Sequence, residues 1–490
     1  MHFRHRAPLC GLAFLAAGLS ASCSSSSTDA LATGPADHLA FLAVPKHVAA
    51  GAAMVPAITV TLADAAGHAL STGTDPVTIA IDSNPAAGTL TGTLTVNAVA
   101  GTATFSDLQI NNAGVGYKLK VTSGTLGPAI SDSIAVSPPM STVASFAAGY
   151  TWTCARTPAS TLFCWGHNSG GEGGNGTKTN SASPVPVSGS YTWSQVTAGG
   201  SQTCGLASGG VAYCWGHDYF GELGDNKNTP SDTPSLVSGG LTFSALSAGG
   251  AHTCGITTGG ATYCWGYNAT GDLGTGDTVA SLVPRLMAGS HVFTQISAGQ
   301  HHSCGITAAG AAWCWGSNAN GELGDSTRTN SDTAVLVKGG HTFLSISAGG
   351  THVCGVATGG VGYCWGLDND GELGDNTTTQ SSVPVAVSGG LTWATLSAGG
   401  ALTCGVTTGG VGYCWGHNSE GQLGIGSTTG VKVPTAVAGG LVFGAIDASN
   451  IHSCGVTTAQ VAYCWGASTE GQLGDGTVGT TRTSPTAVLP

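Results

Sequence analysis

The chain has 490 residues, of which 80 are glycine and only 8% are charged, and its formal net charge is -12. This length is enough for two or three domains, and a glycine-rich, charge-poor composition favours short strands and turns over long helices. With 13 Lys and Arg against 25 Asp and Glu, the chain offers no basic surface for a phosphate backbone, so we expect no nucleic acid partner.

The first segment, residues 1–22, has the features of an export signal. Arg4 and Arg6 are basic, residues 9–19 form a short apolar run, and small residues precede Cys23. The run is too short to cross a membrane as a mature helix. Cleavage before Cys23 would leave its thiol at the new N-terminus, where bacterial lipoproteins carry their lipid. We therefore expect lipidation at Cys23, with secretion and a free Cys23 as the alternative.

The next two segments differ in pattern. Residues 23–35 are small and polar, which predicts a flexible tether. Residues 36–138 alternate apolar and polar side chains, as at Ile58, Val60 and Leu62, and about seven such short runs predict a β-sandwich. The segment Gly-Thr-Ala-Thr-Phe, followed by Gly-Val-Gly-Tyr-Lys-Leu, resembles bacterial immunoglobulin-like domains of cell-surface proteins. That resemblance implies a spacer or an adhesive module.

A Cys-Trp-Gly motif recurs every fifty residues within residues 141–490. Each repeat has four strand signals: one led by an aromatic residue, two that carry a cysteine, and one of the Pro-x-x-Val type. Periods of this size are typical of β-propellers, in which each repeat builds one four-stranded blade. We predict an all-β chain in which a seven-bladed propeller follows an immunoglobulin-like β-sandwich, and we expect the C-terminal strand at residues 485–489 to pair into the first blade. The repeated tryptophans are Trp165, Trp215, Trp265, Trp315, Trp365, Trp415 and Trp465.

The string from Cys-Trp-Gly to Gly-Glu-Leu-Gly resembles the repeats of the regulator of chromosome condensation family. Kelch repeats have a similar period and are the structural alternative. The family resemblance implies a propeller and, for its nuclear members, guanine nucleotide exchange.

Two cysteines lie ten positions apart in every repeat, on neighbouring predicted strands. In an exported protein such pairs predict disulfides. Zinc binding is the alternative, but the spacing differs from that of the usual zinc sites. The predicted pairs are Cys154–Cys164, Cys204–Cys214, Cys254–Cys264, Cys304–Cys314, Cys354–Cys364, Cys404–Cys414 and Cys454–Cys464.

Histidines recur two positions before the first cysteine of a repeat, at His252, His302, His352 and His452. Equivalent positions around a ring suggest a metal site. However, a seven-fold ring separates such side chains widely, and Trp152, Gln202 and Leu402 occupy the same position elsewhere. We interpret these histidines as structural.

Acidic or amide residues occupy one turn position throughout the repeats. Paired carboxylates are used in acid–base catalysis, but glutamine replaces two of them, so we interpret them as turn residues. Asp368-Asn369-Asp370-Gly371 resembles the start of a calcium loop without the glutamate at the twelfth position. We expect no catalytic residue, metal or cofactor. The turn residues are Glu172, Glu222, Asp272, Glu322, Glu372, Gln422 and Gln472.

Binding residues are sought where one repeat departs from the others. Tyr219 and Phe220 in the second repeat and Tyr267 in the third put aromatic residues into the turn of adjacent repeats, where other repeats carry residues such as Ser, Asn or Ala. Exposed aromatic side chains are typical anchors of interfaces. We predict a partner surface at these three residues.

The predicted function is therefore that of a monomeric, non-catalytic binding scaffold. It is exported and either lipid-anchored at the bacterial cell envelope, with no other membrane contact, or secreted, and it presents propeller loops to a protein or glycan. Because a secreted β-lactamase inhibitor is similar in being a propeller of this family, inhibition of an extracellular enzyme is the alternative. Guanine nucleotide exchange is disfavoured because an exported chain meets no cytosolic GTPase. Ultraviolet sensing, known in a plant member, is disfavoured because its Gly-Trp-Arg-His-Thr motif is absent.

Overall fold

The computed structural model describes residues 36–66, 68–70, 72–137 and 140–489. In these residues the structure is β throughout, apart from two short 3-10 turns at Ser208–Gly210 and Thr358–Gly360. The predicted signal, the tether and Cys23 lie outside the described residues. No helix in the described part of the chain is both long and apolar enough to cross a membrane.

The N-terminal strands form two main sheets that share one core. The alternating side chains Val60, Val77, Ile79 and Phe105 are all buried in it, which confirms the strand pattern expected there. One sheet has the order β1 (His38–Ala43), β3 (Ile58–Ala63), β7 (Thr102–Phe105). The other has the order β2 (His47–Ala49), β11 (Ile134–Ser137), β9 (Gly114–Thr122), β4 (Pro76–Ser83), β6 (Thr95–Asn97), with β10 (Ala129–Ile130) beside β9, and β5 (Leu90–Thr91) pairs with β8 (Gln109–Ile110).

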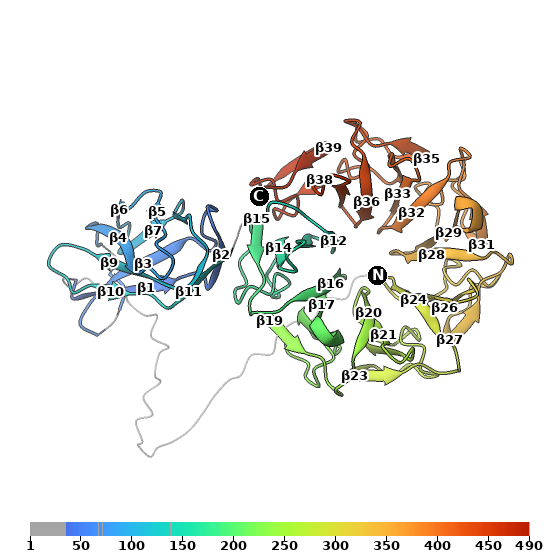
Figure 1. The fold of residues 1–490 in the computed structure, drawn as a ribbon, viewed down its shortest axis with the longest axis horizontal. Coiled ribbons are helices and arrows are strands. Elements are labelled where there is room, and N and C mark those ends of the chain that lie inside the picture. The colour runs from blue at the N-terminus through green and yellow to red at the C-terminus, as the bar shows by residue number, and fades with distance from the viewer. Residues whose placement is uncertain (1–35, 67, 71, 138–139, 490) are drawn as a thin grey trace, which may run out of the picture.

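The rest of the described chain forms seven four-stranded antiparallel sheets, each from strands in chain order. They stand around a common axis like the blades of a wheel (Figure 1). The sheets, called sheet 1 to sheet 7 below, are β12 (Ser145–Ala148), β13 (Trp152–Arg156), β14 (Leu162–Gly166), β15 (Ser181–Pro186); β16 (Trp193–Ala198), β17 (Gln202–Ala207), β18 (Val211–Gly216), β19 (Ser231–Leu236); β20 (Phe243–Ala248), β21 (His252–Thr257), β22 (Thr262–Gly266), β23 (Ser281–Leu286); β24 (Phe293–Ala298), β25 (His302–Thr307), β26 (Ala312–Gly316), β27 (Ser331–Leu336); β28 (Phe343–Ala348), β29 (His352–Ala357), β30 (Val361–Gly366), β31 (Ser381–Ala386); β32 (Trp393–Ala398), β33 (Leu402–Thr407), β34 (Gly412–Gly416), β35 (Val431–Ala436); and β36 (Phe443–Ala448), β37 (His452–Thr457), β38 (Ala462–Ser468), β39 (Thr480–Ala487).

The first strand of each sheet lies nearest the axis, where small residues such as Ala198, Gly199 and Gly200 surround a narrow central cavity. The third strand ends in the Cys-Trp-Gly motif, whose glycine turns the chain sharply. Gly216 has a φ of +105°, and a Cβ there would lie 2.8 Å from the carbonyl oxygen of Ser201. Only glycine adopts this conformation at little cost, so the motif ends the third strand at the same point in sheets 1 to 6, whereas β38 of sheet 7 continues to Ser468.

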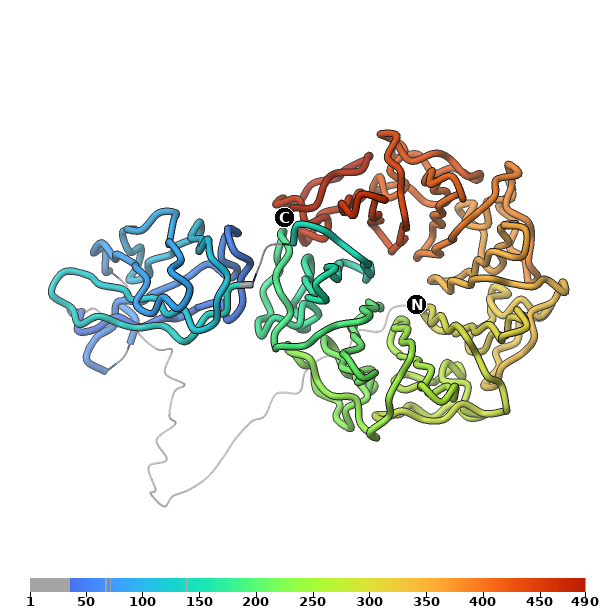
Figure 2. The backbone as a smooth tube through the Cα atoms, in the orientation of Figure 1, coloured from blue at the N-terminus to red at the C-terminus, as the bar shows by residue number. Residues whose placement is uncertain are grey.

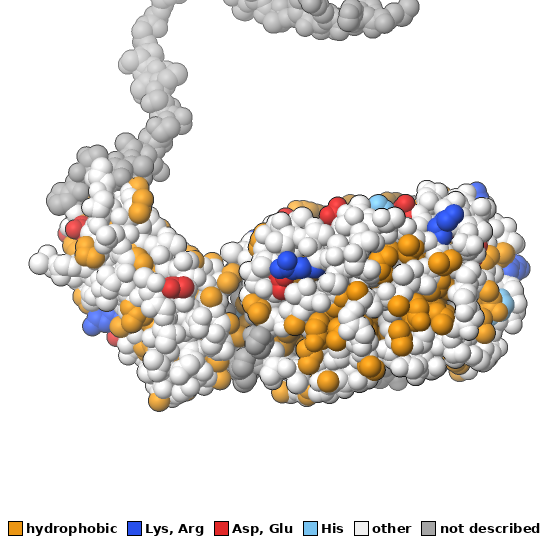
Figure 3. Space-filling view, turned by 90° about the horizontal axis from the view of Figure 1, so that it is seen from above, with side chains coloured by type: hydrophobic (Ala, Val, Ile, Leu, Met, Phe, Trp, Pro, Cys, Tyr) orange, Lys and Arg blue, Asp and Glu red, His pale blue; other side chains and the backbone are white. Residues whose placement is uncertain are grey.

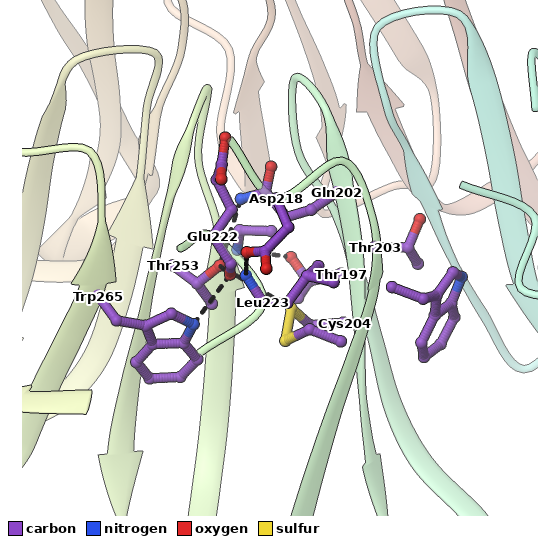
Figure 4. The surroundings of a disulfide bond; sticks show 12 residues. Thr197, Gln202, Thr203, Cys204, Asp218, Glu222, Leu223, Thr253 and Trp265 are labelled. Atoms are coloured by element: carbon purple, nitrogen blue, oxygen red, sulfur yellow. Dashed lines mark hydrogen bonds between the residues drawn. A yellow bond between two sulfur atoms is a disulfide. The ribbon is translucent and has the colours of Figure 1, made fainter. Parts of the chain in front are cut away.

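The repeated tryptophan joins each sheet to the one before it. Each indole is buried and donates its Nε1 hydrogen to a backbone carbonyl on the turn of the preceding repeat. Trp265, for example, donates to the carbonyl of Glu222 at 2.9 Å (Figure 4). A buried donor without a partner costs about 1–3 kcal/mol, so these bonds fix the spacing between neighbouring sheets.

The ring closes without an exchanged strand. We expected the C-terminal strand to complete sheet 1, but β39 pairs with β38 in sheet 7, and that prediction was wrong. Each repeat supplies its own fourth strand, so none is left over for another sheet. The chain makes one circuit and ends beside sheet 1 (Figure 2). There Trp165 donates to the carbonyl of Gln472 at 2.9 Å, and the backbone N–H of Ala148 donates to Asp447 at 2.9 Å.

The N-terminal domain lies against the outer edge of sheet 1, where β2 contacts β15. Ala49 of this domain belongs to one buried cluster with Met140 and Phe163. Seen edge-on, the ring of sheets is a flattened disc whose rim carries patches of apolar side chains (Figure 3). Val411 and Val442 are among the exposed apolar residues of its last sheets.

Candidate functional site

A groove opens at the end of the ring where the first strand of each sheet turns into the second and where the Cys-Trp-Gly strand ends. It lies over sheets 1 to 4 and has a volume of about 490 Å³. We call it the aromatic groove. Its lining includes Tyr150, His167, Glu172, His217, Tyr219, Phe220, Glu222 and His301.

Two of the three predicted binding residues, Tyr219 and Phe220, line this groove, and the third, Tyr267, packs against Phe220 beside it. Phe220 and Tyr267 meet edge to face with ring centroids 5.1 Å apart, although they lie on different sheets. Tyr219 lies 5.1 Å from the ring of His217. Tyr219 is 65% exposed and Phe220 is 44% exposed. Large aromatic surfaces are thus held at the rim of the groove by neighbours that fix their position.

Glu172 lies at the floor of the groove between two histidines that the sequence analysis did not single out. Its Oε1 is 3.3 Å from Nδ1 of His167 and 3.3 Å from Nε2 of His217, and its side chain is only 1% exposed. Burial alone would raise the pKa of this carboxyl, but the hydrogen bonds from both imidazoles outweigh it and hold the pKa at about 2. The bond to Glu172 in turn raises the pKa of His167.

The sequence contains one signal for this cluster, at Gly170, three residues after His167. Gly170 stands where the other repeats carry Phe220, Thr270, Asn320 or a longer acidic side chain. A side chain at position 170 would collide with the imidazole of His217. The glycine in sheet 1 therefore makes room for His217 of sheet 2 to reach Glu172. This departure from the repeat pattern lies in the repeat next to the one that carries Tyr219 and Phe220.

Glu222 lines the same groove but lacks such a close imidazole pair. Its Oε2 accepts a hydrogen bond from the backbone N–H of Phe220 at 2.8 Å. Burial raises the pKa of Glu222, and burial also raises the pKa of Asp218 on the same turn to about 7. One oxygen of Asp218 is buried without a hydrogen-bond partner among the described residues. Figure 4 shows both carboxylates on the turn near the disulfide of Cys204.

The acidic turn position has the structural role that was predicted for it. In each repeat its side-chain oxygen accepts a hydrogen bond from the backbone N–H two residues earlier, as Glu372 does from Asp370 at 2.8 Å. Gln422 makes the same bond with Glu420 at 2.9 Å. The turn therefore requires an acceptor oxygen and not a negative charge.

His167 contacts both a serine and a carboxylate: its Nε2 is 2.8 Å from Oγ of Ser169, and its Nδ1 is 3.3 Å from Glu172. Such a set resembles a hydrolase triad, which also needs free N–H groups for an oxyanion. Here the N–H of Gly170 donates to Glu172 and that of Gly171 donates to the carbonyl of Asn168. The turn thus uses the nearby donors to hold itself together.

The recurring histidines are buried between sheets. Nε2 of His252 lies 2.8 Å from Oγ of Ser303 on the next sheet, and Nε2 of His352 lies 2.8 Å from Oγ1 of Thr403. Burial lowers the pKa of His252 to about 4, so it is neutral at pH 7. Across the described residues, no three His, Cys, Asp or Glu side chains form a group that could hold a metal ion.

In the segment that resembles the start of a calcium loop, residues 368–371, the first aspartate stabilises the turn. Asp368 is fully buried, and its Oδ1 accepts a hydrogen bond from the N–H of Leu373 at 2.9 Å. Asn318 makes the same bond to Leu323 at 2.9 Å in another repeat.

The disulfide prediction is confirmed in every repeat. The two cysteines face each other on the second and third strands, as Cys204 and Cys214 do with Cα atoms 4.1 Å apart. All seven predicted pairs are joined. Disulfides in this number are typical of an extracellular or otherwise oxidising environment.

Comparison with known sequences identifies the repeat. Residues 259–306 and 410–455 match the regulator of chromosome condensation (RCC1) repeat, and residues 293–322 match a second description of it. The chain contains RCC1 repeats. No curated protein matches the chain.

Solved structures show the same fold. The chain is similar to yeast RCC1 (Prp20) bound to Kap60, with 20% identity and a TM-score of 0.61 over 67% of this chain and 83% of that one. It is similar to Prp20p of Saccharomyces cerevisiae, with 19% identity and a TM-score of 0.61 over 70% and 87%. It is also similar to human WBSCR16, with 18% identity and a TM-score of 0.59 over 73% and 92%. At this identity the likeness shows an RCC1-like propeller fold.

Proposed function

We propose that this protein is an exported, non-catalytic binding scaffold whose RCC1-type propeller presents the aromatic groove to a protein or glycan. The observation that carries the proposal is the exposure of Tyr219 and Phe220 along one groove, with Tyr267 packed against Phe220 beside it. These side chains differ from those of the other repeats, so the fold does not require them. Exposed aromatic side chains around a concave surface are typical of binding sites.

The domain arrangement that we propose is an immunoglobulin-like domain at residues 36–138 and a seven-bladed propeller at residues 141–490. Each four-stranded sheet supplies one blade. An immunoglobulin-like domain is supported by Tyr117, whose hydroxyl donates to the backbone carbonyl of Asn112 at 2.9 Å. A tyrosine bonded to the backbone a few residues upstream is a feature of that fold.

The disulfides support export. The signal at residues 1–22 and lipidation at Cys23 remain part of the proposal, with the N-terminal domain as the spacer between the envelope and a monomeric propeller.

Inhibition of an extracellular enzyme is the second candidate. It is favoured by the exposure of Tyr219 and Phe220, which project far enough to enter a concave site on another protein. Guanine nucleotide exchange has less support. The yeast structures are described with Kap60 in one case and with binding to Gsp1p and histones in the other, but an oxidising compartment separates this chain from cytosolic GTPases.

The test compares two triple variants of the full chain in cross-linking and recovery of partners at the cell surface. One carries Tyr219→Ala, Phe220→Ala and Tyr267→Ala. The matched control carries Asn369→Ala, Asp370→Ala and His417→Ala, which are the equivalent positions on the other side of the ring. We expect the first variant to lose partners that the wild type and the control retain. Equal recovery by all three would overturn the proposal.

A further inference from the structure

The polar lining of the aromatic groove is acidic. Glu172 and Glu222 lie in it, its other titratable groups are three histidines and two tyrosines, and no Lys or Arg lines it within the described residues. Asp218 adds a third carboxyl on the turn that carries Glu222, and Asp272 lies 3.6 Å from His301. The groove is therefore complementary in charge to a cation.

The fold does not account for this charge. Gln422 and Gln472 stand at the turn position of Glu222 in sheets 6 and 7 and accept the same backbone hydrogen bond, at 2.9 Å and 2.8 Å. Burying a carboxylate is costly unless a counter-charge is supplied. Glu172 receives one from its two histidines, whereas Glu222 forms no ion pair among the described residues and accepts backbone N–H groups, including that of Phe220 at 2.8 Å. A cation bound in the groove would supply the missing counter-charge.

The rim provides the second half of a cation site. The exposed rings of Tyr219 and Phe220 line the same groove as these two glutamates, and Tyr267 packs against Phe220. The face of an aromatic ring attracts a guanidinium or ammonium group, and arginine stacks on such rings most often. An arginine or lysine side chain laid across the rings would direct its charged end towards Glu222 and Glu172.

We propose that the aromatic groove binds a basic side chain, arginine or lysine, from an exposed segment of a protein partner. This inference rests on the proposed function and narrows it to a protein with a basic contact segment. The net charge of -12 adds long-range attraction for such a partner.

The test measures binding of the full chain to a short arginine-containing peptide by calorimetry at low and moderate salt. The same peptide with citrulline is the neutral control, and tetramethylammonium tests whether a small free cation suffices. We expect the citrulline peptide to bind about tenfold or more weakly, because a desolvated cation–aromatic contact and a carboxylate are both lost. Binding should weaken further as salt screens the charges.

Glu222→Gln is the decisive variant, with Glu372→Gln as its control outside the groove. Glutamine already fills this turn position in two repeats, so both variants should fold, which their circular dichroism and melting temperatures will verify. We expect Glu222→Gln to weaken the arginine peptide about fivefold or more and Glu372→Gln to leave it unchanged.

Equal affinity for the arginine and citrulline peptides, no binding of either, or no effect of Glu222→Gln would each overturn this inference. Tight binding of tetramethylammonium alone would also overturn it in favour of a small quaternary ammonium ligand. None of these results decides whether the aromatic groove is the partner-binding surface, because the triple alanine variant tests that proposed function independently.

Discussion

The indole of Trp215 donates a hydrogen bond to the backbone carbonyl of Glu172 at 2.8 Å. The two residues come from neighbouring repeats, so this bond joins sheet 1 to sheet 2. The side chain of the same glutamate lies at the floor of the aromatic groove. The frame and the candidate site therefore share a residue, and the repeat that builds the ring also positions the groups that make sheets 1 to 3 different.

One seam of the ring lacks a hydrogen bond that its neighbours have. Among the described residues, Nε2 of His302 has no hydrogen-bond partner, because Val353 stands where Thr403 and Ser303 offer a hydroxyl in other seams. Val353→Thr should supply the partner and raise the free energy of unfolding by about 1 kcal/mol. Thr403→Val, which breaks the bond to His352, should lower it by about 1–3 kcal/mol. Urea unfolding measures both, and a Val353→Thr protein less stable than wild type would contradict this account of the seam.

Asp218 should make stability depend on pH near neutrality. Its folded pKa of about 7 lies above the ordinary value of 3.8, so its contribution is present at low pH and is lost as pH rises through about 7. Other repeats have asparagine at the equivalent position, for example Asn268 and Asn318. Asp218→Asn should therefore fold and should remove this loss of stability. We expect the variant to gain about 1–3 kcal/mol over wild type at pH 8 and much less at pH 4. A constant difference between pH 4 and pH 8 would show that the carboxyl does not titrate in this range.

Glu172 should act in the opposite direction. Its folded pKa of about 2 lies below the ordinary value of 4.5, so its stabilising contribution is present above pH 4.5 and is lost as pH falls towards 2. Glu172→Gln keeps the hydrogen bond to the N–H of Gly170, as Gln422 does in its own repeat, but removes the ionic contact with both histidines. We expect it to cost about 1–2 kcal/mol at pH 6 and little at pH 2. Unfolding curves at the two pH values decide this, with Glu322→Gln as the control away from the histidine cluster.

The disulfides should stabilise the propeller separately and by similar amounts. Replacing Cys204 and Cys214 together by alanine opens one closed hairpin, which should cost about 2–3 kcal/mol in the chain-entropy model. A reducing agent should lower the melting temperature of the wild type further, because it opens all of the pairs. Mass spectrometry of the alkylated protein measures their state. Free thiols at these fourteen positions in protein taken from its native compartment would contradict an oxidising environment.

Much of the arrangement of strands and disulfides could be predicted, because the same sequence pattern recurs in every repeat. The ten-residue spacing between Cys204 and Cys214 fixed the register of two strands, and the positions of the buried tryptophans and histidines followed from the period. Ring closure could not be predicted, since the alternation at residues 485–489 is the same whether the strand pairs with its own sheet or with sheet 1. In the structure β39 pairs with β38, the strand that precedes it in the chain and whose edge is free to accept it.

Only the aromatic part of the candidate site could be predicted from the sequence. Tyr219, Phe220 and Tyr267 stand out because no other repeat has a Phe, Tyr or Trp at their positions. Glu172 does not stand out, because an acidic residue at its position is the rule, and its special surroundings come from His217 on the next sheet. Only the three-dimensional arrangement shows that Gly170 opens the space between them.

The most direct test of the groove as the binding surface is site-specific photo-cross-linking. A photoreactive amino acid at position 219 would be compared with one at position 369, the equivalent turn position in sheet 5, in the exported full-length protein. We predict a discrete cross-linked product from position 219, reduced by Phe220→Ala, and none from position 369. Products of equal yield from both positions, or none from position 219 in the presence of a bound partner, would contradict the account.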